Sequence, residues 1–343
     1  MMESLATSLK GLLGPDVWSV VSFVYWQIFW PLISQPSMHW VYLLSSLLLG
    51  CIFLIVAVAP QRLVLRSLPG ELFPRVIWSH ASTKVDVRFF VLNQLLMSHL
   101  RLNVWVIGLF GLLQVQETVQ GLLGLLVSAP DPARAPGALA LATFTLSMGV
   151  AFDFARYLSH RLHHRIPVLL EFHKVHHSAE VLTVFSNYRN HPVETMVELL
   201  LRLVAAAVVG GVFGCFYSAG LKEYTVLNYG ALTFIYYLTA HLRHSHVPFD
   251  FGPLRLVFIS PRMHHLHHSA DPKHFDRNFG FLLSCWDRCA GTLYLPHPGE
   301  TFKLGLPPEA GRFDSAWNLL VQPFVASYRL LLPQRVPREP VVR

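Results

Sequence analysis

Long apolar runs, separated by short polar or proline-containing links, are the main pattern of this chain. Each run is about as long as a helix that crosses a hydrocarbon core of roughly 30 Å. In the third run, Arg101 indicates a short helix followed by a crossing, and residues 121–127 suit an interfacial piece. The runs cover Val17–Ile33, His39–Pro60, Phe89–Val115, Ala138–Phe154, Glu194–Tyr217 and Tyr224–Ala240. We therefore expect an all-α, polytopic membrane helical bundle of about six spans.

Basic residues predict how these spans are oriented. The link after the second run carries five basic side chains between Arg62 and Arg88, which places it on the cytoplasmic face. Four crossings return the chain to the cytoplasm after Phe154, and the last two runs form a hairpin joined at residues 218–223. The segments outside the spans then form a cytoplasmic, histidine-rich helical cap. Near the end, the amphipathic segment Phe324–Leu332 suits a helix lying on the membrane.

Composition supports a membrane protein. Hydrophobic residues make up 53% of the 343 residues and charged residues only 14%, which is not typical of soluble domains. Positive-inside anchoring explains the net charge of +7, and no separate basic stripe indicates nucleic acid. An Arg-rich, Lys-poor composition favours a bacterial inner membrane over the endoplasmic reticulum. We expect an N-terminal transmembrane region at 1–135, a catalytic region with two further spans at 136–300, and an amphipathic tail at 301–343.

The distribution of histidines indicates metal binding. The stretch Asp153–Asn278 holds fifteen of the nineteen histidines, in short-spaced clusters. Residues three and four apart share one face of a helix, so each cluster presents two or three imidazoles together. Eight imidazoles exceed what one four- or six-coordinate ion can use, so two metal ions are the economical interpretation. The eight are His160, His164, His173, His176, His177, His264, His267 and His268.

The residues that flank these histidines carry a resemblance. Asp153-x-x-Arg156-Tyr157 precedes the first cluster, Ser178 follows the second, and Ser260-Pro261-Arg262 precedes the third. Further similarity extends through Asn190-His191-Pro192, residues 242–246, Asp276-Arg-Asn278-Phe-Gly280 and Trp286-Asp287-Arg288. Over residues 150–296 the chain resembles the fatty acid hydroxylase or sterol desaturase superfamily, whose members are integral membrane enzymes with a non-haem di-iron centre.

The resemblance implies two iron ions, O2 and a membrane lipid substrate, although zinc could fill a recombinant site. It implies that the eight histidines are ligands, with His244 as a ninth. His241, on the same helical face, is a rival for the ninth position. His191 is either a ligand or a neighbour of the ligands. Asp153, two turns before His160, is expected to orient a ligand histidine, and Asn278 to orient the third cluster. Electrons would come from a separate donor protein of the ferredoxin, rubredoxin or cytochrome b5 type with its reductase, because the chain has no GxGxxG motif.

The predicted function is hydroxylation of a lipid C–H bond on an acyl chain, a sterol or another lipid. Desaturation by the same site is the close alternative, because both reactions begin with the same hydrogen abstraction. A histidine-rich membrane metal transporter or sensor is an alternative of another class, and it would place histidines or carboxylates at mid-span. The complete clusters disfavour a scaffold without chemistry.

Overall fold

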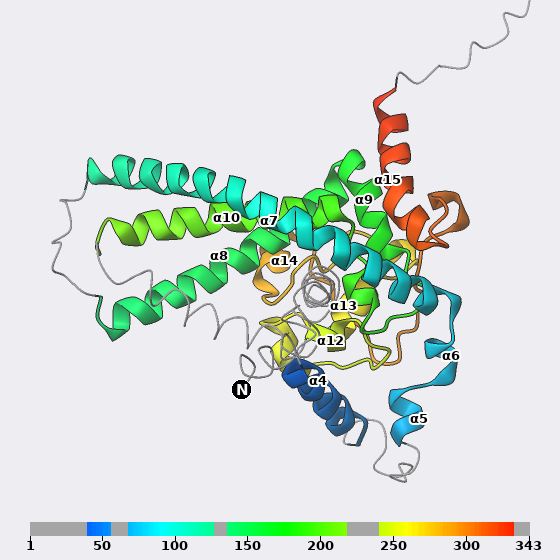
Figure 1. Ribbon diagram of the computed structural model, residues 1–343. Helices are drawn as coiled ribbons and strands as arrows, with labels where there is room; N and C mark the ends of the chain where they lie inside the picture. Colours follow the sequence, from blue (N-terminus) through cyan, green and yellow to red (C-terminus); the bar gives the residue numbers. More distant parts are fainter. Residues whose placement is uncertain (1–39, 56–67, 127–135, 218–239, 333–343) are drawn as a thin grey trace, which may run out of the picture.

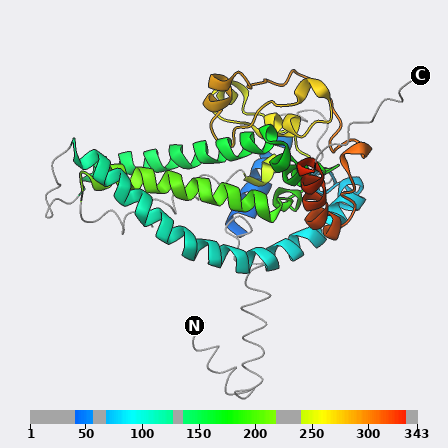
Figure 2. The ribbon, with the colours of Figure 1, turned by 90° about the horizontal axis from the view of Figure 1, so that it is seen from above.

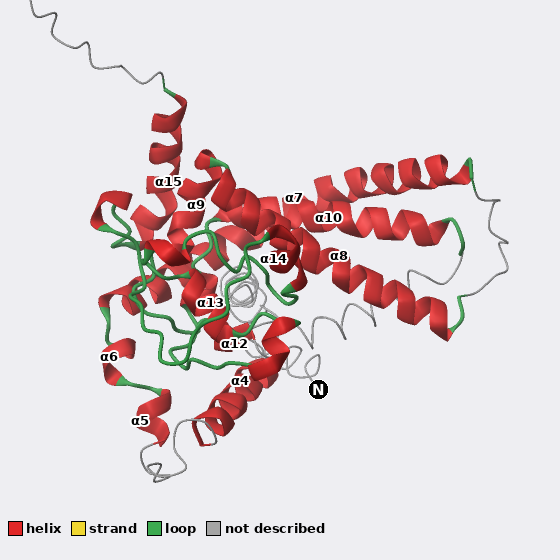
Figure 3. Cartoon of the chain, turned by 180° about the vertical axis from the view of Figure 1, so that it is seen from behind, coloured by secondary structure: helices red, strands yellow, loops and turns green. Residues whose placement is uncertain are grey.

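A computed structural model describes residues 40–55, 68–126, 136–217 and 240–332 (Figure 1). Over these ranges the chain is helical and contains no strand (Figure 3), which confirms the predicted all-α class. The predicted run Val17–Ile33, and residues 224–239 of the last run, lie outside the described residues.

Three long helices project together from one side of the molecule (Figures 1 and 2). They are α7 (Ala81–Gly124), α8 (Ala138–Arg165) and α10 (Pro192–Gly214), and α10 packs against both of the others. Gly211 shows how closely α10 approaches α7, because a Cβ atom added there would lie 2.7 Å from the Cβ of Val119. Within the described part of the chain, α8 and α10 are the two helices long and apolar enough to cross a membrane.

The long helix α7 differs from the prediction. Instead of a short helix, a separate crossing and an interfacial piece, a single helix of 44 residues runs from Ala81 to Gly124. No proline interrupts this stretch, so every turn keeps its backbone hydrogen bonds, and the charge of Arg101 alone does not end a helix. The His80 side chain begins α7 by accepting a hydrogen bond from the Ser82 backbone N–H, at 3.2 Å.

Shorter helices at the other end of α8 and α10 form a compact cap. The helix α9 (Pro167–His177) follows α8 after one residue, and Pro167 occupies its first turn, where the missing N–H costs nothing. Ser260 begins α13 (Pro261–His267) by accepting a hydrogen bond from the Met263 N–H at 3.3 Å. The described residues also form α4 (Trp40–Phe53), α5 (Leu68–Leu72), α6 (Arg75–Trp78), α12 (Ala240–Arg243), α14 (Cys285–Ala290) and a C-terminal helix described below. Short 3-10 turns lie at η4 (Ser186–Tyr188), η5 (Gly252–Leu256), η6 (Pro272–His274) and η7 (Pro308–Ala310).

The C-terminal helix α15 (Ala316–Leu331) is longer than the predicted segment Phe324–Leu332 and includes Pro323. It starts at Ser315, whose side chain accepts a hydrogen bond from the Asn318 N–H at 3.2 Å. One face of α15 packs on α7 and α9, where Leu319 joins a buried cluster with Val85, Phe89 and Val175. The buried face of the amphipathic helix therefore contacts protein, and α15 is a part of the cap.

A buried ion pair ties the cap together. Arg189 is 1% exposed, and its Nη1 donates to the Asp86 carboxylate of α7 at 2.6 Å. The same guanidinium donates to the carbonyls of Val175 (3.1 Å), Ser178 (3.3 Å) and Phe313 (3.1 Å). One side chain thus joins α7, the end of α9 and the segment before α15.

Candidate metal centre

Nine histidine side chains converge inside the cap, from α8, α9, α13 and the residues that directly follow α12 and α13. They form two clusters, and within each cluster one ring nitrogen per residue lies within 4.8 Å of the others. The first cluster contains His160, His164, His173, His177 and His267, and the second contains His176, His244, His264 and His268. These are the nine histidines that we predicted from the sequence as ligands. The structure brings them together.

In the first cluster, contacts at Nδ1 determine which ring nitrogen faces the centre. His160 Nδ1 lies 2.8 Å from the Phe279 carbonyl oxygen and His267 Nδ1 lies 2.7 Å from that of Arg277. A carbonyl oxygen only accepts, so each Nδ1 carries the proton and each Nε2 has a free lone pair. Carboxylates contact two further histidines, Glu194 at 2.9 Å from His173 Nδ1 and Asp276 at 3.5 Å from His164 Nδ1. Such contacts are typical of histidines that bind metal ions.

Three Nε2 atoms of the first cluster lack protein partners. They belong to His160, His173 and His267, are buried, and have no hydrogen-bond partner among the described residues. The Nε2 atoms of His164 and His177 lie 3.1 Å apart. Buried polar atoms usually have a partner, so converging unpartnered lone pairs fit a cation that binds between them.

The second cluster is arranged similarly around His244. The Ser186 hydroxyl donates to the Thr183 carbonyl at 2.8 Å, so it accepts from His244 Nδ1 at 3.0 Å. His244 Nε2 is therefore unprotonated and faces His264 Nε2 at 2.9 Å. The Nε2 of His268 lies 3.2 Å from that of His264. This cluster can offer four imidazole nitrogens to one ion.

Burial keeps these imidazoles neutral. It lowers the pKa of His176 from 6.5 to about 3, and it lowers the pKa of His177, His264 and His268 well below the ordinary value. Metal ions bind the unprotonated nitrogen of histidine, so the site is in its metal-binding state at neutral pH. Imidazole suits iron, copper and zinc, and donor sets of five and four nitrogens fit one transition-metal ion each.

Neighbouring residues serve different clusters. His176 belongs to the second cluster and His177 to the first, and likewise His268 belongs to the second and His267 to the first. Successive side chains of a helix point about 100° apart, so one backbone segment directs ligands into both clusters. The two clusters thus share the ends of α9 and α13.

Comparisons with known proteins agree with this arrangement. Residues 145–292 match the family model for fatty acid hydroxylases, and these residues include all nine clustered histidines. The chain carries a fatty acid hydroxylase domain. The resemblance predicted from the sequence is confirmed.

Named relatives belong to the same superfamily. An ornithine lipid hydroxylase of Rhizobium tropici is 30% identical over 202 residues, which cover 58% of this chain and 56% of that protein. The alkylglycerol monooxygenase of Danio rerio is 26% identical over 44% of this chain and 33% of its own length. The lathosterol oxidase of Rattus norvegicus is 29% identical over 43% of this chain and 44% of its own length. The chain thus spans from a third to little more than half of each relative. No solved structure matches the chain.

Asp153 has a different role in the hydroxylase domain from the one predicted. Its carboxylate accepts hydrogen bonds from the backbone N–H groups of Leu282 (2.8 Å) and Leu283 (3.1 Å) and from Trp286 Nε1 (2.8 Å). The second partner of His160 is the Phe279 carbonyl instead. Two helical turns place Asp153 about 10 Å along α8 from His160, too far for direct contact. Asp153 therefore holds the loop before α14 against α8.

Asn278 holds the loop behind the third histidine cluster. Its Nδ2 donates to the carbonyls of Met263 (3.3 Å) and Tyr294 (2.9 Å), and its Oδ1 accepts from the Tyr294 N–H at 2.8 Å. Met263 immediately precedes His264, so these hydrogen bonds join the loop at residue 278 to α13 and to residue 294. That Asn278 orients the third histidine cluster stays a prediction.

The other histidines have separate partners. His191 accepts from the Val193 N–H at 3.1 Å, as the residue that begins α10, and its Nε2 lies 3.0 Å from the Leu320 carbonyl. His241 is buried but belongs to neither cluster, so the geometry favours His244 for the ninth position. His163 contacts the Ser159 carbonyl at 2.8 Å, and His274 lies between Ser269 (2.8 Å) and Glu300 (3.0 Å).

Sequence reasoning missed most of the residues that orient the ligands. Glu194 is one of them, since its carboxylate contacts His173. Glu198, one turn later on α10, instead lies 3.6 Å from Arg202 and 3.4 Å from Arg156 of α8. An acidic residue at the start of an apolar run was the available signal for Glu194. Ser186 and the carbonyls of Phe279 and Arg277 carried no signal in the sequence.

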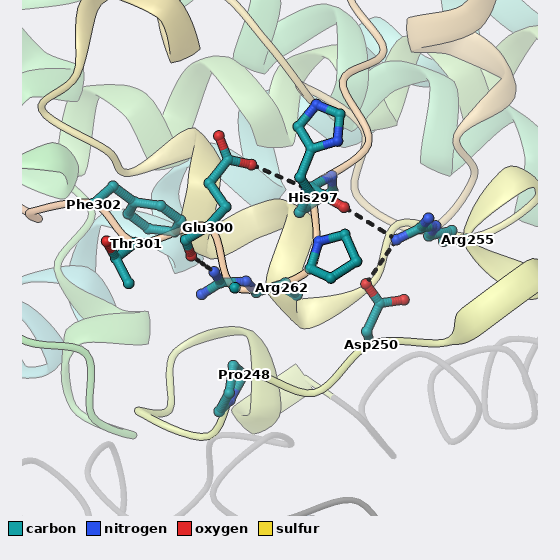
Figure 4. Close-up of a pocket in the computed structure, with 11 residues that line it drawn as sticks. Pro248, Asp250, Arg255, Arg262, His297, Glu300, Thr301 and Phe302 are labelled. Atoms are coloured by element: carbon teal, nitrogen blue, oxygen red, sulfur yellow. Dashed lines mark hydrogen bonds and ion pairs between the residues drawn. The ribbon is translucent and has the colours of Figure 1, made fainter.

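A separate pocket lies on the cap, between residues 248–262 and 296–302 (Figure 4). Its volume is about 560 Å³, and none of the nine clustered histidines lines it. Arg255 Nη1 is already bound to the Asp250 carboxylate at 3.2 Å and to the Pro296 carbonyl at 3.3 Å, and Arg262 donates to the Glu300 carbonyl. The pocket is therefore distinct from the metal centre.

Proposed function

We propose that this protein is a membrane-bound di-iron oxygenase that hydroxylates a C–H bond of a lipid, with O2 and with electrons from a separate protein. The observation that carries the proposal is the pair of buried, neutral histidine clusters at the cap end of α8 and α10. The relatives support it, since their names describe a lipid hydroxylase, a monooxygenase of alkylglycerols and an oxidase of a sterol.

The residues have distinct tasks in this proposal. The five histidines of the first cluster would hold one iron ion and the four of the second cluster the other. Bound iron would supply the activation of O2 and the removal of hydrogen from an unactivated C–H bond. Glu194 and the Phe279 carbonyl hold imidazoles with the Nε2 lone pair inward. The buried surroundings keep bulk water away from the reacting carbon.

The membrane arrangement is part of the same proposal. We infer about six spans, with the cap and its histidines on the cytoplasmic face of a bacterial inner membrane. Residues 1–135 would contribute the first spans, 136–300 the catalytic region and 301–343 the tail, which includes α15 on the cap. A lipid substrate would enter sideways from the bilayer, with its apolar body along α8 and α10 and its target carbon at the clusters.

Desaturation is the second candidate reaction. The same hydrogen abstraction begins both reactions, and one relative is named an oxidase instead of a hydroxylase. A metal transporter is less well supported. In the described part of the chain, the apolar stretches at residues 138–152 of α8 and 203–214 of α10 carry no histidine or carboxylate that could line a path.

The test is to purify the full chain in detergent, measure bound metal, and add O2, a reductant and a lipid extract. We expect two iron ions per chain and a lipid product that has gained one oxygen atom. Mass spectrometry distinguishes this from a loss of two hydrogens, which would indicate desaturation. The double change His176→Ala and His267→Ala should abolish both metal binding and product, whereas the exposed residue change His297→Ala should affect neither. Metal content below two and insensitive to the double change would refute the di-iron proposal.

A further inference from the structure

The contacts that hold the ligand histidines lead to the surface at one place. Phe279 and Ser186, which contact His160 and His244, are 0% exposed, and the Glu194 side chain is 14% exposed. The Asp276 side chain, which contacts His164 at 3.5 Å, is 48% exposed. Next to it, the carbonyl of Arg277 contacts His267 at 2.7 Å. Apart from the partly exposed rings of His160 and His164, Asp276 is therefore the most exposed of these contacts to the first cluster.

The backbone of this segment is held in an unusual conformation. Asp276 and Asn278 have φ angles of 58° and 57°, in the left-handed region that residues other than glycine rarely adopt. The three hydrogen bonds of the buried Asn278 side chain maintain this conformation. In this segment the Phe275 side chain is 54% exposed, while the Arg277 carbonyl lies 2.7 Å from His267 Nδ1.

The surface around Phe275 has the character of a docking site. Phe275 is a large exposed apolar side chain two residues before Arg277. Arg165, the exposed last residue of α8, directly follows His164, whose Nδ1 lies 3.5 Å from the Asp276 carboxylate, so Arg165 is close to this segment. Within the described chain neither arginine forms an ion pair, and Arg277 Nη1 donates to the Gly291 carbonyl at 3.2 Å. An exposed aromatic ring with arginines beside it is typical of a protein interface that binds an acidic partner.

The position of this surface favours a soluble partner. Arg165 lies at the end of α8 opposite to Ala138, about 40 Å away along a helix of 28 residues. The long helices α7, α8 and α10 extend away from the cap on one side of the molecule (Figure 2). Arg165, and the Asp276 segment that contacts the neighbouring His164, therefore lie at the end of α8 away from its proposed span, where a water-soluble protein can approach.

We propose that Arg165, Phe275, Asp276 and Arg277 form the surface on which an acidic electron-donor protein docks. This inference rests on the proposed oxygenase function. Each encounter would transfer one electron: the reduced iron–sulfur or haem group of the donor is oxidised, and the metal centre is reduced by one electron. The route runs through Asp276 to His164 and through the Arg277 carbonyl to His267, both in the first cluster.

The test compares two reductants on the iron-loaded full chain in detergent. The variant Arg165→Glu with Phe275→Ser removes the apolar contact and reverses one charge, while the Asp276 and Arg277 contacts to histidine stay in place. A reduced plant-type [2Fe–2S] ferredoxin, which is acidic, is mixed with the protein, and its oxidation is followed by stopped-flow absorbance. We expect the second-order rate constant to fall about tenfold or more, with a weaker dependence on salt. Reduction by methyl viologen radical, which needs no docking surface, should be unchanged.

A matched control makes the same two kinds of change on α15. Trp317→Ser with Arg329→Glu removes an aromatic ring that is 66% exposed and reverses an exposed arginine, and among the described contacts neither residue touches a clustered histidine. This variant should react with ferredoxin as the wild type does. Equal ferredoxin rates for the wild type and the Arg165/Phe275 variant, including the case in which neither is reduced, would overturn the docking proposal. A protein that binds no iron, or that methyl viologen cannot reduce, would instead refute the proposed function.

Discussion

At the scale of single residues, the centre depends on side chains that never face the metal. Each cluster offers neutral imidazole nitrogens, and a contact on the opposite side of several rings selects the nitrogen that is offered. Carboxylates hold two histidines and backbone carbonyls hold two more in the first cluster. Metal affinity should therefore respond to residues outside the ligand set.

The change Glu194→Ala tests this dependence. His173 would lose the carboxylate that accepts its Nδ1–H, so iron affinity of the first cluster should fall by about 10- to 100-fold. Competition with a chromophoric chelator measures the affinity. Glu198→Ala is the control, because Glu198 lies one turn later on α10 and pairs with Arg156 and Arg202. Unchanged affinity in the Glu194 variant would show that the contact does not support metal binding.

The buried imidazoles also predict how pH affects the metal-free protein. The pKa of His176 is about 3 in the folded chain against 6.5 for an ordinary histidine, so between these values the unfolded chain binds more protons. Stability should then fall as pH falls below about 6.5, and it should be unaffected by this group above that value. Thermal unfolding of the iron-free protein between pH 7.5 and 5.0 measures the slope.

A double variant provides the comparison for that slope. His176→Asn with His268→Asn removes two buried groups whose pKa is lowered by burial, so the melting temperature should depend less steeply on pH than in the wild type. An equal slope in both proteins would mean that these histidines do not control acid stability.

At the scale of elements, the cap is joined to α7 by the buried pair of Asp86 and Arg189. The guanidinium also satisfies carbonyls at the end of α9, next to the ligands His176 and His177. This arrangement makes the position of α9 depend on a residue outside the histidine clusters.

Changing Arg189 to Met should destabilise the protein by about 3–5 kcal/mol, because the Asp86 carboxylate would remain buried without its partner. Denaturant titration in mixed micelles measures the difference. The double variant Asp86→Leu with Arg189→Met removes both charges and should recover part of the loss. A double variant less stable than Arg189→Met alone would contradict this account.

The sequence could predict features that depend on residues close together along the chain, but not contacts between residues far apart along it. The faces of the histidine clusters follow from helical spacing, so the nine clustered residues were predictable from motif and resemblance. The partners of Nδ1 were not, because Phe279 lies 119 residues from His160 and offers only a backbone carbonyl. Asp153 was misplaced because its spacing from His160 suggested a shared face but not the loop at 282–286 that approaches it. The continuity of α7 was missed because a charge was taken as a break.

At the scale of the whole molecule, the long helices and the cap predict that one face is accessible from the cytoplasm. Cys285 and Cys289 of α14 are exposed and form no disulfide, whereas Cys215, the residue that follows α10, is buried. In inside-out bacterial vesicles, a membrane-impermeant maleimide should label Cys285 and Cys289, and in spheroplasts it should not. Mass spectrometry of the labelled peptides reads the result, and Cys285→Ala with Cys289→Ala provides the unlabelled control. Labelling only in spheroplasts would reverse the proposed orientation.

The shared backbone of the two clusters has a consequence for how the protein is loaded in the cell. His176 with His177, and His267 with His268, are neighbours that serve different clusters, so an ion that immobilises one ring also restrains the next. The second ion then binds to a site that the first ion has already ordered, so its binding loses less conformational entropy. This is positive cooperativity. If the proposed di-iron function holds, chains supplied with too little iron should therefore divide into empty and fully loaded molecules, and half-loaded chains should be rare.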